Sequence, residues 1–182
     1  MKHSLFVLCA VLLLTSAAVV RCQGQGGLTS IPRFEDYPVT SVFHGKPAEP
    51  AFRKGEGFRT QIRNGALKGP NFAGHYTIIK WGCGSGCISF AIVDAISGRL
   101  YYPIPFAGLA IPYQGTAGGR EYKGLEYRLN SSLLVADGCP EDPQTDDSSK
   151  AEKNCGTRYY KWEQNRFVQI SSIAVPAAPA KK

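Results

Sequence analysis

The 182-residue chain lacks an apolar run long enough to cross a bilayer. Its longest such run covers residues 5–14, whereas a spanning helix needs about 20 residues. Lys2 precedes this run and small residues follow it at 15–18, a pattern typical of a cleaved secretory signal. We therefore expect no transmembrane segment, a signal peptide at residues 1–22 cleaved after Ala18 or Cys22, and a periplasmic or secreted protein.

The sequence also lacks a cluster of basic residues, although it is basic overall. The whole chain has 21 Lys and Arg against 14 Asp and Glu. Loss of Lys2 and Arg21 with the signal peptide leaves 19 basic residues, so the net charge of the mature chain is +5. Scattered bases and an export signal argue against nucleic acid. The positive charge favours an anionic cell-envelope component or a protein as the partner, whose identity the sequence leaves unknown.

Several ligand-binding patterns are incomplete. The glycine-rich stretch 115–119 lacks the lysine and the following helix of a phosphate-binding loop. Five acidic residues lie between positions 140 and 154 but lack the spacing of an EF-hand calcium loop. No cofactor is expected, and we interpret residues 140–154 as a solvated surface loop.

The remaining chain predicts one domain preceded by an extended segment. Residues 23–50 form a leader and a proline-rich arm that we expect to wrap the surface through Phe34, Tyr37 and Phe43. Residues 51–172 form the β domain, and residues 173–182, which are rich in alanine, proline and lysine, form a disordered tail.

Residues 69–103 contain the strongest strand signals. Residues 76–81 and 88–94 are β-branched and aromatic, and residues 90–93 are apolar on both faces, as in a central covered strand. Glycines between these runs and at Gly98 permit tight reversals. With a third strand around Leu100, these segments predict an antiparallel meander. We expect a mainly β fold, a single antiparallel-meander domain built as a small barrel or sandwich of about seven strands.

The C-terminal part adds further strands. Residues 125–129 alternate, residues 133–136 follow a turn, and residues 159–170 read as a hairpin. A reversal at Gln164 and Asn165 would set Trp162 across from Phe167. The intervening segment, 104–119, is rich in proline and glycine and predicts a loop.

One short N-terminal helix is predicted at residues 57–67. Phe58, Ile62 and Ala66 recur at helical spacing and would form its buried face. Arg59 and Arg63 lie on another face, which we expect to be solvated, with an anion site as the alternative.

Six cysteines are present, and cleavage after Cys22 would leave an even number, Cys83, Cys87, Cys139 and Cys155. The glycine-rich reversal brings Cys83 and Cys87 near each other, and a polar loop separates Cys139 from Cys155. Local pairing closes both loops at low entropic cost, so we expect the disulfides Cys83–Cys87 and Cys139–Cys155.

The motifs GPNFAGHY, WGCGSGC and FAIVD.ISG, with the closing hairpin YY.W....F, resemble a group of uncharacterised exported bacterial proteins. The resemblance covers about residues 34–170. It implies export and a single domain, and it implies no chemistry.

Three hypotheses for the function follow. The expected one is an exported, disulfide-stapled, non-catalytic binding or structural module of the bacterial cell envelope.

The second hypothesis is a thiol enzyme with Cys87 as nucleophile, His75 as base and Asp94 nearby. The stretch around Cys87 is similar to the L,D-transpeptidase signature, but Ser85 and Ser89 replace its histidine and arginine.

The third hypothesis is a soft-metal site. A C-x-x-x-C spacing with His75 suits copper(I), and the four cysteines at 83, 87, 139 and 155 suit zinc except for the long gap in the second pair. Against both site hypotheses, His75 is expected to be a structural residue that bonds a backbone carbonyl at a strand start, and Trp81 to cover the core.

Overall fold

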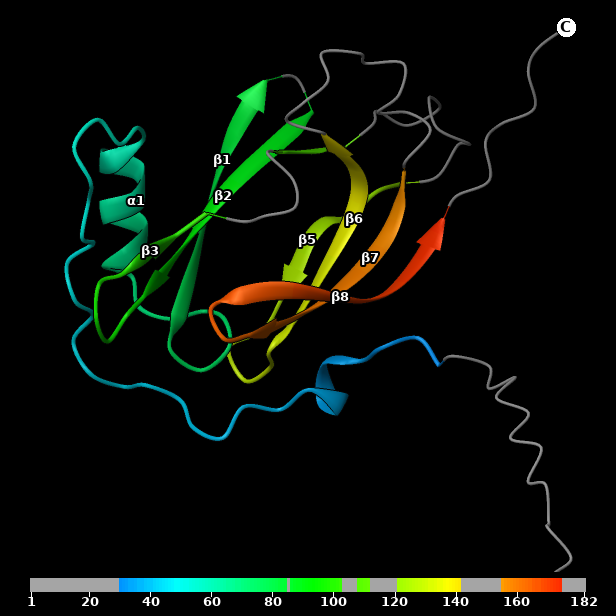
Figure 1. Ribbon diagram of the computed structural model, residues 1–182, viewed down its shortest axis with the longest axis horizontal. Coiled ribbons are helices and arrows are strands. Elements are labelled where there is room, and N and C mark those ends of the chain that lie inside the picture. The colour runs from blue at the N-terminus through cyan, green and yellow to red at the C-terminus, as the bar shows by residue number, and fades with distance from the viewer. Residues whose placement is uncertain (1–29, 85, 103–107, 112–120, 142–154, 175–182) are drawn as a thin grey trace, which may run out of the picture. The chain divides into compact units, whose positions relative to one another are not determined.

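A computed structural model describes residues 30–84, 86–102, 108–111, 121–141 and 155–174 (Figure 1). These residues, apart from Ser30, belong to one compact unit, Ile31–Lys182. The expected signal peptide, the glycine-rich stretch 115–119, most of the acidic segment and residues 175–182 of the expected tail lie outside the described residues. Within the described part, no helix is long and apolar enough to span a membrane.

The fold is mainly β and antiparallel, as predicted. Its sheet contains eight strands: β1 (Tyr76–Gly84), β2 (Cys87–Asp94), β3 (Leu100–Tyr101), β4 (Gly108–Ala110), β5 (Gly124–Tyr127), β6 (Leu133–Glu141), β7 (Gly156–Glu163) and β8 (Arg166–Ala174). The main order is β1-β2-β4-β6-β7-β8, while β3 pairs with β2 and β5 pairs with β6. It is a single open sheet, with β1 and β8 at its ends, rather than the expected barrel or sandwich.

Strand β4 joins two halves of this sheet. Its residues pair with the beginning of β2 and with the end of β6. Strand β3 pairs with another part of β2, and β5 pairs with another part of β6. Among the described strands, only β4 therefore forms backbone hydrogen bonds with both halves of the sheet. The largest hydrophobic cluster includes residues of both halves, among them Ile78, Phe90, Leu134 and Tyr160. The halves therefore share one core.

Strand β2 is the central strand that its apolar sequence predicts. Phe90, Ala91, Ile92 and Val93 are each at most 2% exposed. Phe90 and Ile92 face the main core, whereas Ala91 and Val93 belong to a second cluster with helix α1 (Arg59–Ala66). Alternating side chains thus cover both faces of the strand.

Helix α1 lies within the predicted range 57–67 and packs against β1 (Figure 1). Ile62 and Ala66 are buried as expected. Phe58 is not, because it is the N-cap residue with a left-handed backbone (φ 55°) and a side chain that is 51% exposed. The prediction that Phe58 continues the buried face was therefore wrong.

The C-terminal hairpin follows the prediction closely. Gln164 and Asn165 form a two-residue turn with positive φ angles of 50° and 62°, the geometry of a type I′ turn. Trp162 pairs with Phe167, and their ring centroids are 4.8 Å apart. Strand β8 continues to Ala174, two residues into the segment predicted as tail.

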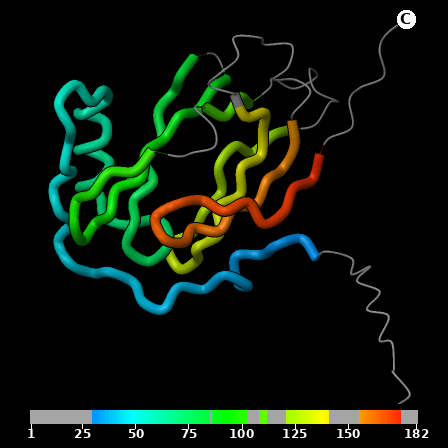
Figure 2. The backbone as a smooth tube through the Cα atoms, viewed as in Figure 1, coloured from blue at the N-terminus to red at the C-terminus, as the bar shows by residue number. Residues whose placement is uncertain are grey.

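The arm 31–50 is traced in Figure 2 from the short 3-10 helix η1 (Phe34–Asp36) along the β5–β8 half to α1. Backbone hydrogen bonds fix the arm to the domain, from Val39 to Asn130, from Phe43 to Gly74 and from Ala48 to Ala95.

The prediction of a loop at residues 104–119 needs one correction, because this range contains β4. Three residues with no local strand signal become a strand by pairing with β2 and β6.

Candidate functional site

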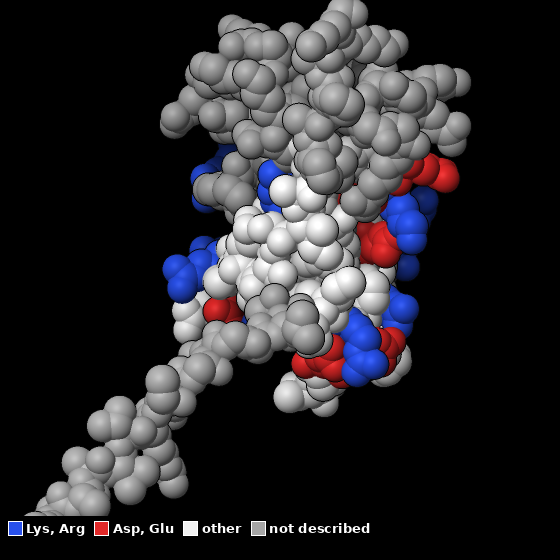
Figure 3. Space-filling model, turned by 90° about the vertical axis from the view of Figure 1, so that its right-hand side faces the viewer, with Lys and Arg blue, Asp and Glu red and all other residues white. Residues whose placement is uncertain are grey.

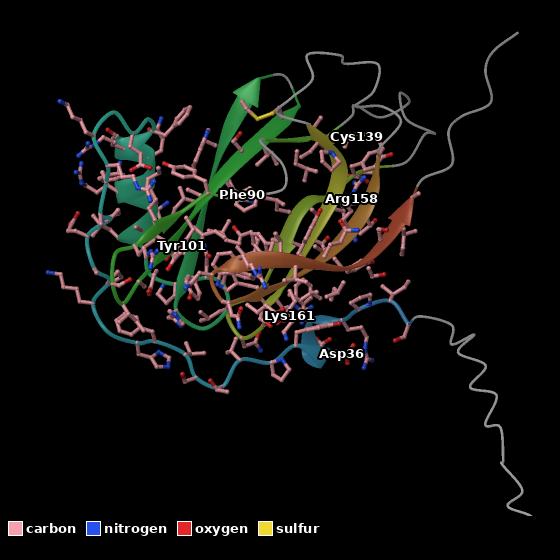
Figure 4. The ribbon with its side chains drawn as sticks, viewed as in Figure 1. Asp36, Phe90, Tyr101, Cys139, Arg158 and Lys161 are labelled. Carbon is pink, nitrogen blue, oxygen red and sulfur yellow. A yellow bond between two sulfur atoms is a disulfide. The ribbon has the colours of Figure 1, made fainter. Side chains whose placement is uncertain are left out.

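The described residues form two disulfides, Cys83–Cys87 and Cys139–Cys155, the pairing expected from the sequence. Cys87 and Cys139 both pair across the sheet with Ala110 of β4. The two disulfides therefore lie at the same end of the sheet, and Figure 4 shows the first as a yellow bond at the tip of the β1–β2 hairpin.

His75 lies at the other end of this hairpin. It directly precedes Tyr76, which pairs with Asp94, whereas Cys87 pairs with Gly84. Cys87 and Asp94 are seven positions apart, which is roughly 23 Å along a strand. A base must lie within hydrogen-bond reach of its nucleophile, so His75 does not activate Cys87, whose sulfur is bonded to Cys83.

The same observations remove the metal sites based on cysteine. All four sulfur atoms form disulfides, and a metal-bound cysteine must be a thiolate. Among the described residues no group of three or more His, Cys, Asp and Glu side chains could hold a metal ion.

His75 belongs to a polar and aromatic cluster. Its Nε2 is 3.9 Å from Asp94 Oδ1, and its ring lies 4.1 Å from that of Tyr76. The His75 carbonyl accepts a hydrogen bond from Ala95. The His75 side chain, just before β1, therefore lies near the Asp94 carboxylate at the end of β2. Among the described residues it makes no hydrogen bond to a backbone carbonyl, which was the expected partner.

Charge is segregated along the described chain. Six Lys and Arg residues, all exposed, stand against two Glu residues between Lys46 and Lys68; the six are Lys46, Arg53, Lys54, Arg59, Arg63 and Lys68. The rest of the described chain has eight basic and eight acidic residues. We call the segment 46–68, which contains α1, the basic layer. On the face turned away from α1, basic and acidic groups lie near each other (Figure 3).

Arg59 and Arg63 in this layer are held by an aromatic ring. Their guanidinium carbons lie 4.6 Å and 5.5 Å from the centre of the Phe52 ring. Arg63 also lies 3.5 Å from Glu49, whereas Arg59 has no ion-pair partner in the described part of the chain. Both guanidinium groups thus contact a ring instead of being fully solvated, and the charge of Arg59 is not neutralised by an ion pair with a described residue.

Two grooves lined by described residues are large enough for a small ligand. The first, the arm groove, has a volume of about 360 Å³ and lies between the arm and the outer face of β5–β7. Its cations have carboxylate neighbours: Arg33 with Asp36, Arg128 with Glu35 and Lys123 with Glu126. Charge in the arm groove is therefore balanced within the protein.

The second, the arginine groove, has a volume of about 350 Å³. Its lining comes from the segment before α1, from β3 and its neighbours, and from the β7–β8 turn: Ala51, Arg53, Glu56, Arg99, Leu100, Tyr101, Tyr102 and Asn165. Within the described chain, neither of its arginines has a carboxylate at ion-pair distance. The Arg99 guanidinium lies 5.4 Å from the Tyr101 ring centre.

Tyrosine ionisation in the arginine groove is suppressed. Burial, and then a hydrogen bond to Glu56 and the charge of that carboxylate, raise the pKa of Tyr102 to about 12. Burial also raises the pKa of Tyr101, against the opposing effect of Arg99. At neutral pH both rings are uncharged, so they do not cancel the two arginines. Tyr101 is labelled in Figure 4, far from the yellow disulfide.

The sequence did not reveal this groove. Arg99 and Tyr101 were visible only as members of an alternating strand, and Asn165 only as a turn residue. The groove assembles because the curved sheet brings β3 near the β7–β8 turn, and no local pattern encodes that approach. Comparison of the chain with protein-family models, with curated proteins and with solved structures gives no match.

Proposed function

We propose that this protein is an exported, non-catalytic binding module of the bacterial cell envelope that binds an acidic polymer through the basic layer. The observation that carries the proposal is the charge segregation. Between Lys46 and Lys68 there are four more basic than acidic residues, whereas the rest of the described chain is balanced. Clustered charge of one sign attracts and orients a polyanion, which evenly mixed charge does not.

The geometry of the layer supports binding rather than catalysis. Stacking of Arg59 and Arg63 on Phe52 restricts both side chains, which lowers the entropy lost when they bind a carboxylate or phosphate. The thiol-enzyme alternative would need a free Cys87 beside His75. Two disulfides also suit a protein that works outside the cytosol.

Binding is tested by retention of the mature protein on immobilised alginate, an acidic polysaccharide, with neutral dextran as control. We expect retention on alginate alone, decreasing as salt screens the charges. The triple variant Lys54→Glu, Arg59→Glu, Lys68→Glu should lose it. The matched triple Lys123→Glu, Lys161→Glu, Arg166→Glu changes the net charge equally outside the layer and should keep most of it. Equal loss in both would show that only net charge matters.

Export is tested separately by N-terminal sequencing of protein from the periplasm or medium. We expect a chain that begins at Val19 or Gln23. Protein that still begins at Met1 in a membrane fraction would contradict the proposed export.

A further inference from the structure

We propose that the arginine groove is a binding site for a small ligand that carries a carboxylate or phosphate group. This inference goes beyond polymer binding by the basic layer. The groove shares Arg53 with that layer, but Arg99, Tyr101 and Asn165, which also line it, lie outside residues 46–68. It rests on three observations: unpaired arginines, a third donor held by a rigid turn, and an acidic residue already engaged by the protein.

The two arginines supply the charge. Arg53 and Arg99 come from segments separated by the β1–β2 hairpin, yet both line the groove. Cations in the arm groove each have a carboxylate within 4 Å, whereas these two have none in the described chain. A guanidinium presents paired N–H donors that match the oxygens of a carboxylate or phosphate. Two such groups without ion-pair partners favour an oxyanion as the ligand.

Asn165 supplies a third donor. Its Oδ1 accepts a hydrogen bond from the Tyr76 hydroxyl at 2.7 Å, which leaves its amide N–H groups for the groove that Asn165 lines. Asn165 belongs to the type I′ turn, and asparagine is one of the few residues that adopt its left-handed backbone readily. The hydrogen bond from Tyr76 therefore orients the side-chain amide of this turn residue.

Glu56 is the acidic residue that lines the groove, and it is engaged within the protein. Its Oε2 accepts a hydrogen bond from the Arg53 backbone N–H at 2.7 Å. The same carboxylate contributes to raising the pKa of the neighbouring Tyr102. The bond from the Arg53 backbone N–H therefore holds the Glu56 carboxylate against its own segment, before α1.

Tyr101 forms an apolar wall. Its ring makes edge contacts with Tyr76 and Trp162, at centroid distances of 6.2 Å and 5.7 Å, so it is anchored to the core. A volume of about 350 Å³ is at the small end of the range for ligand pockets, roughly 300–1,000 Å³. The groove therefore suits a ligand with one acidic group and at most one ring.

The test is an NMR titration of the mature protein with sodium glucuronate, inorganic phosphate and, as neutral control, glucose. Saturable shifts of the Arg53, Arg99 and Asn165 amides are expected with at least one anion and not with glucose. Shifts with both anions indicate that the oxyanion suffices. Shifts with glucuronate alone indicate a carboxylate beside a ring, and shifts with phosphate alone indicate a phosphate ligand. No saturable shift with either anion overturns the proposal.

Two variants make the test specific. Arg99→Ala should weaken anion binding about tenfold or more, since a charged hydrogen bond contributes about 1.5–3 kcal/mol. Asn165→Asp keeps an acceptor for Tyr76 and tolerates the turn, but it replaces the amide donor by a second carboxylate, so anion binding should be lost from a folded protein. Arg166→Ala, beside the turn but outside the groove, should bind normally. Normal binding by a folded Asn165→Asp protein would overturn the proposal.

Failure here is distinguishable from failure of the proposed function. Arg99→Ala and Asn165→Asp should retain alginate binding, because the basic layer is unchanged. Loss of alginate binding in either variant would mean that both activities use one surface, which would contradict a separate small-ligand site.

Discussion

The Tyr76 hydroxyl donates a hydrogen bond to Asn165 Oδ1 at 2.7 Å and thereby links the first strand of the sheet to the turn between its last two strands. Strands β1 and β8 end the sheet and do not pair with each other. Tyr76 also makes an edge contact with Trp162, at a centroid distance of 5.3 Å. Side chains therefore join the ends of an open sheet where backbone hydrogen bonds do not.

We expect Tyr76→Phe to lower the free energy of unfolding by about 1 kcal/mol, because it removes one hydrogen bond and keeps the ring. The measurement is urea denaturation followed by tryptophan fluorescence. Tyr101→Phe is the control, since the structure shows no hydrogen bond from that hydroxyl within the described residues, and it should change stability less. An equal loss in the two variants would contradict a specific role for the Tyr76 bond.

Packing of α1 on β1 depends on Gly65. A Cβ atom at this position would lie 2.5 Å from Ile79 Cγ1, so the helix approaches the strand closely because the side chain is absent. Alanine favours a helix by about 1 kcal/mol over glycine, but overpacking typically costs about 1–3 kcal/mol. We therefore expect Gly65→Ala to destabilise the protein in thermal unfolding.

The matched control is Gly57→Ala. A Cβ atom added at Gly57 would meet no other atom within 4 Å, and this residue lacks a positive φ, so the substitution should be neutral. A gain of stability in Gly65→Ala would show that the helix can move away from Ile79 at little cost.

Much of the fold was predictable from local pattern. Residues 90–93 identified the central strand, and Gln164 with Asn165 identified the hairpin that sets Trp162 across from Phe167. Strand β4 was not predictable, because Leu109 gains its partners from Ile88 and Pro140, which are distant in sequence. Phe58 was misassigned because helical periodicity does not show where the first turn begins.

The candidate sites were harder to predict than the strands. The sequence analysis took the basic residues as scattered and missed their excess over acidic residues in 46–68. Only the structure shows that Arg59 and Arg63 share the Phe52 ring. Arg99 and Asn165 are far apart along the chain, and they meet because of sheet curvature. His75 and Cys87 are near in sequence and yet lie at opposite ends of a hairpin, since extended strands separate residues rapidly.

The Tyr102 hydroxyl should lose its proton only at a pH above the ordinary tyrosine pKa. With its pKa raised to about 12, first by burial and then by Glu56, a ¹³Cζ NMR titration should find it still protonated at pH 10, the ordinary tyrosine pKa. Glu56→Gln removes the carboxylate but leaves the burial, so it should lower the Tyr102 pKa only partly. A Tyr102 midpoint near 10 in the unsubstituted protein would contradict both the burial of this hydroxyl and its contact with Glu56.

Stability should fall in alkaline solution for the same reason. Burial raises the pKa of Tyr76, Tyr101, Tyr127 and Tyr160 as well as that of Tyr102. A tyrosine whose pKa is higher in the folded than in the unfolded protein favours folding while it is protonated. This contribution is fully present below pH 10 and is lost as pH rises through the folded values toward about 12. Urea midpoints measured from pH 8 to 12 should show the decline.

The two disulfides should contribute unequally to stability. Their cysteines are 4 and 16 positions apart, and the chain-entropy model gives about 2 and about 3 kcal/mol for such loops. Cys139 and Cys155 are also buried, at 2% and 4% exposure, whereas Cys83 is exposed. We expect Cys139→Ala/Cys155→Ala to lower the free energy of unfolding more than Cys83→Ala/Cys87→Ala. Urea denaturation measures the difference.

The cysteines of both disulfides should also be unreactive toward a thiol reagent in the native protein. Iodoacetamide at neutral pH should therefore label the unsubstituted protein only after reduction. Rapid labelling of native Cys87 would contradict a Cys83–Cys87 disulfide in the folded protein.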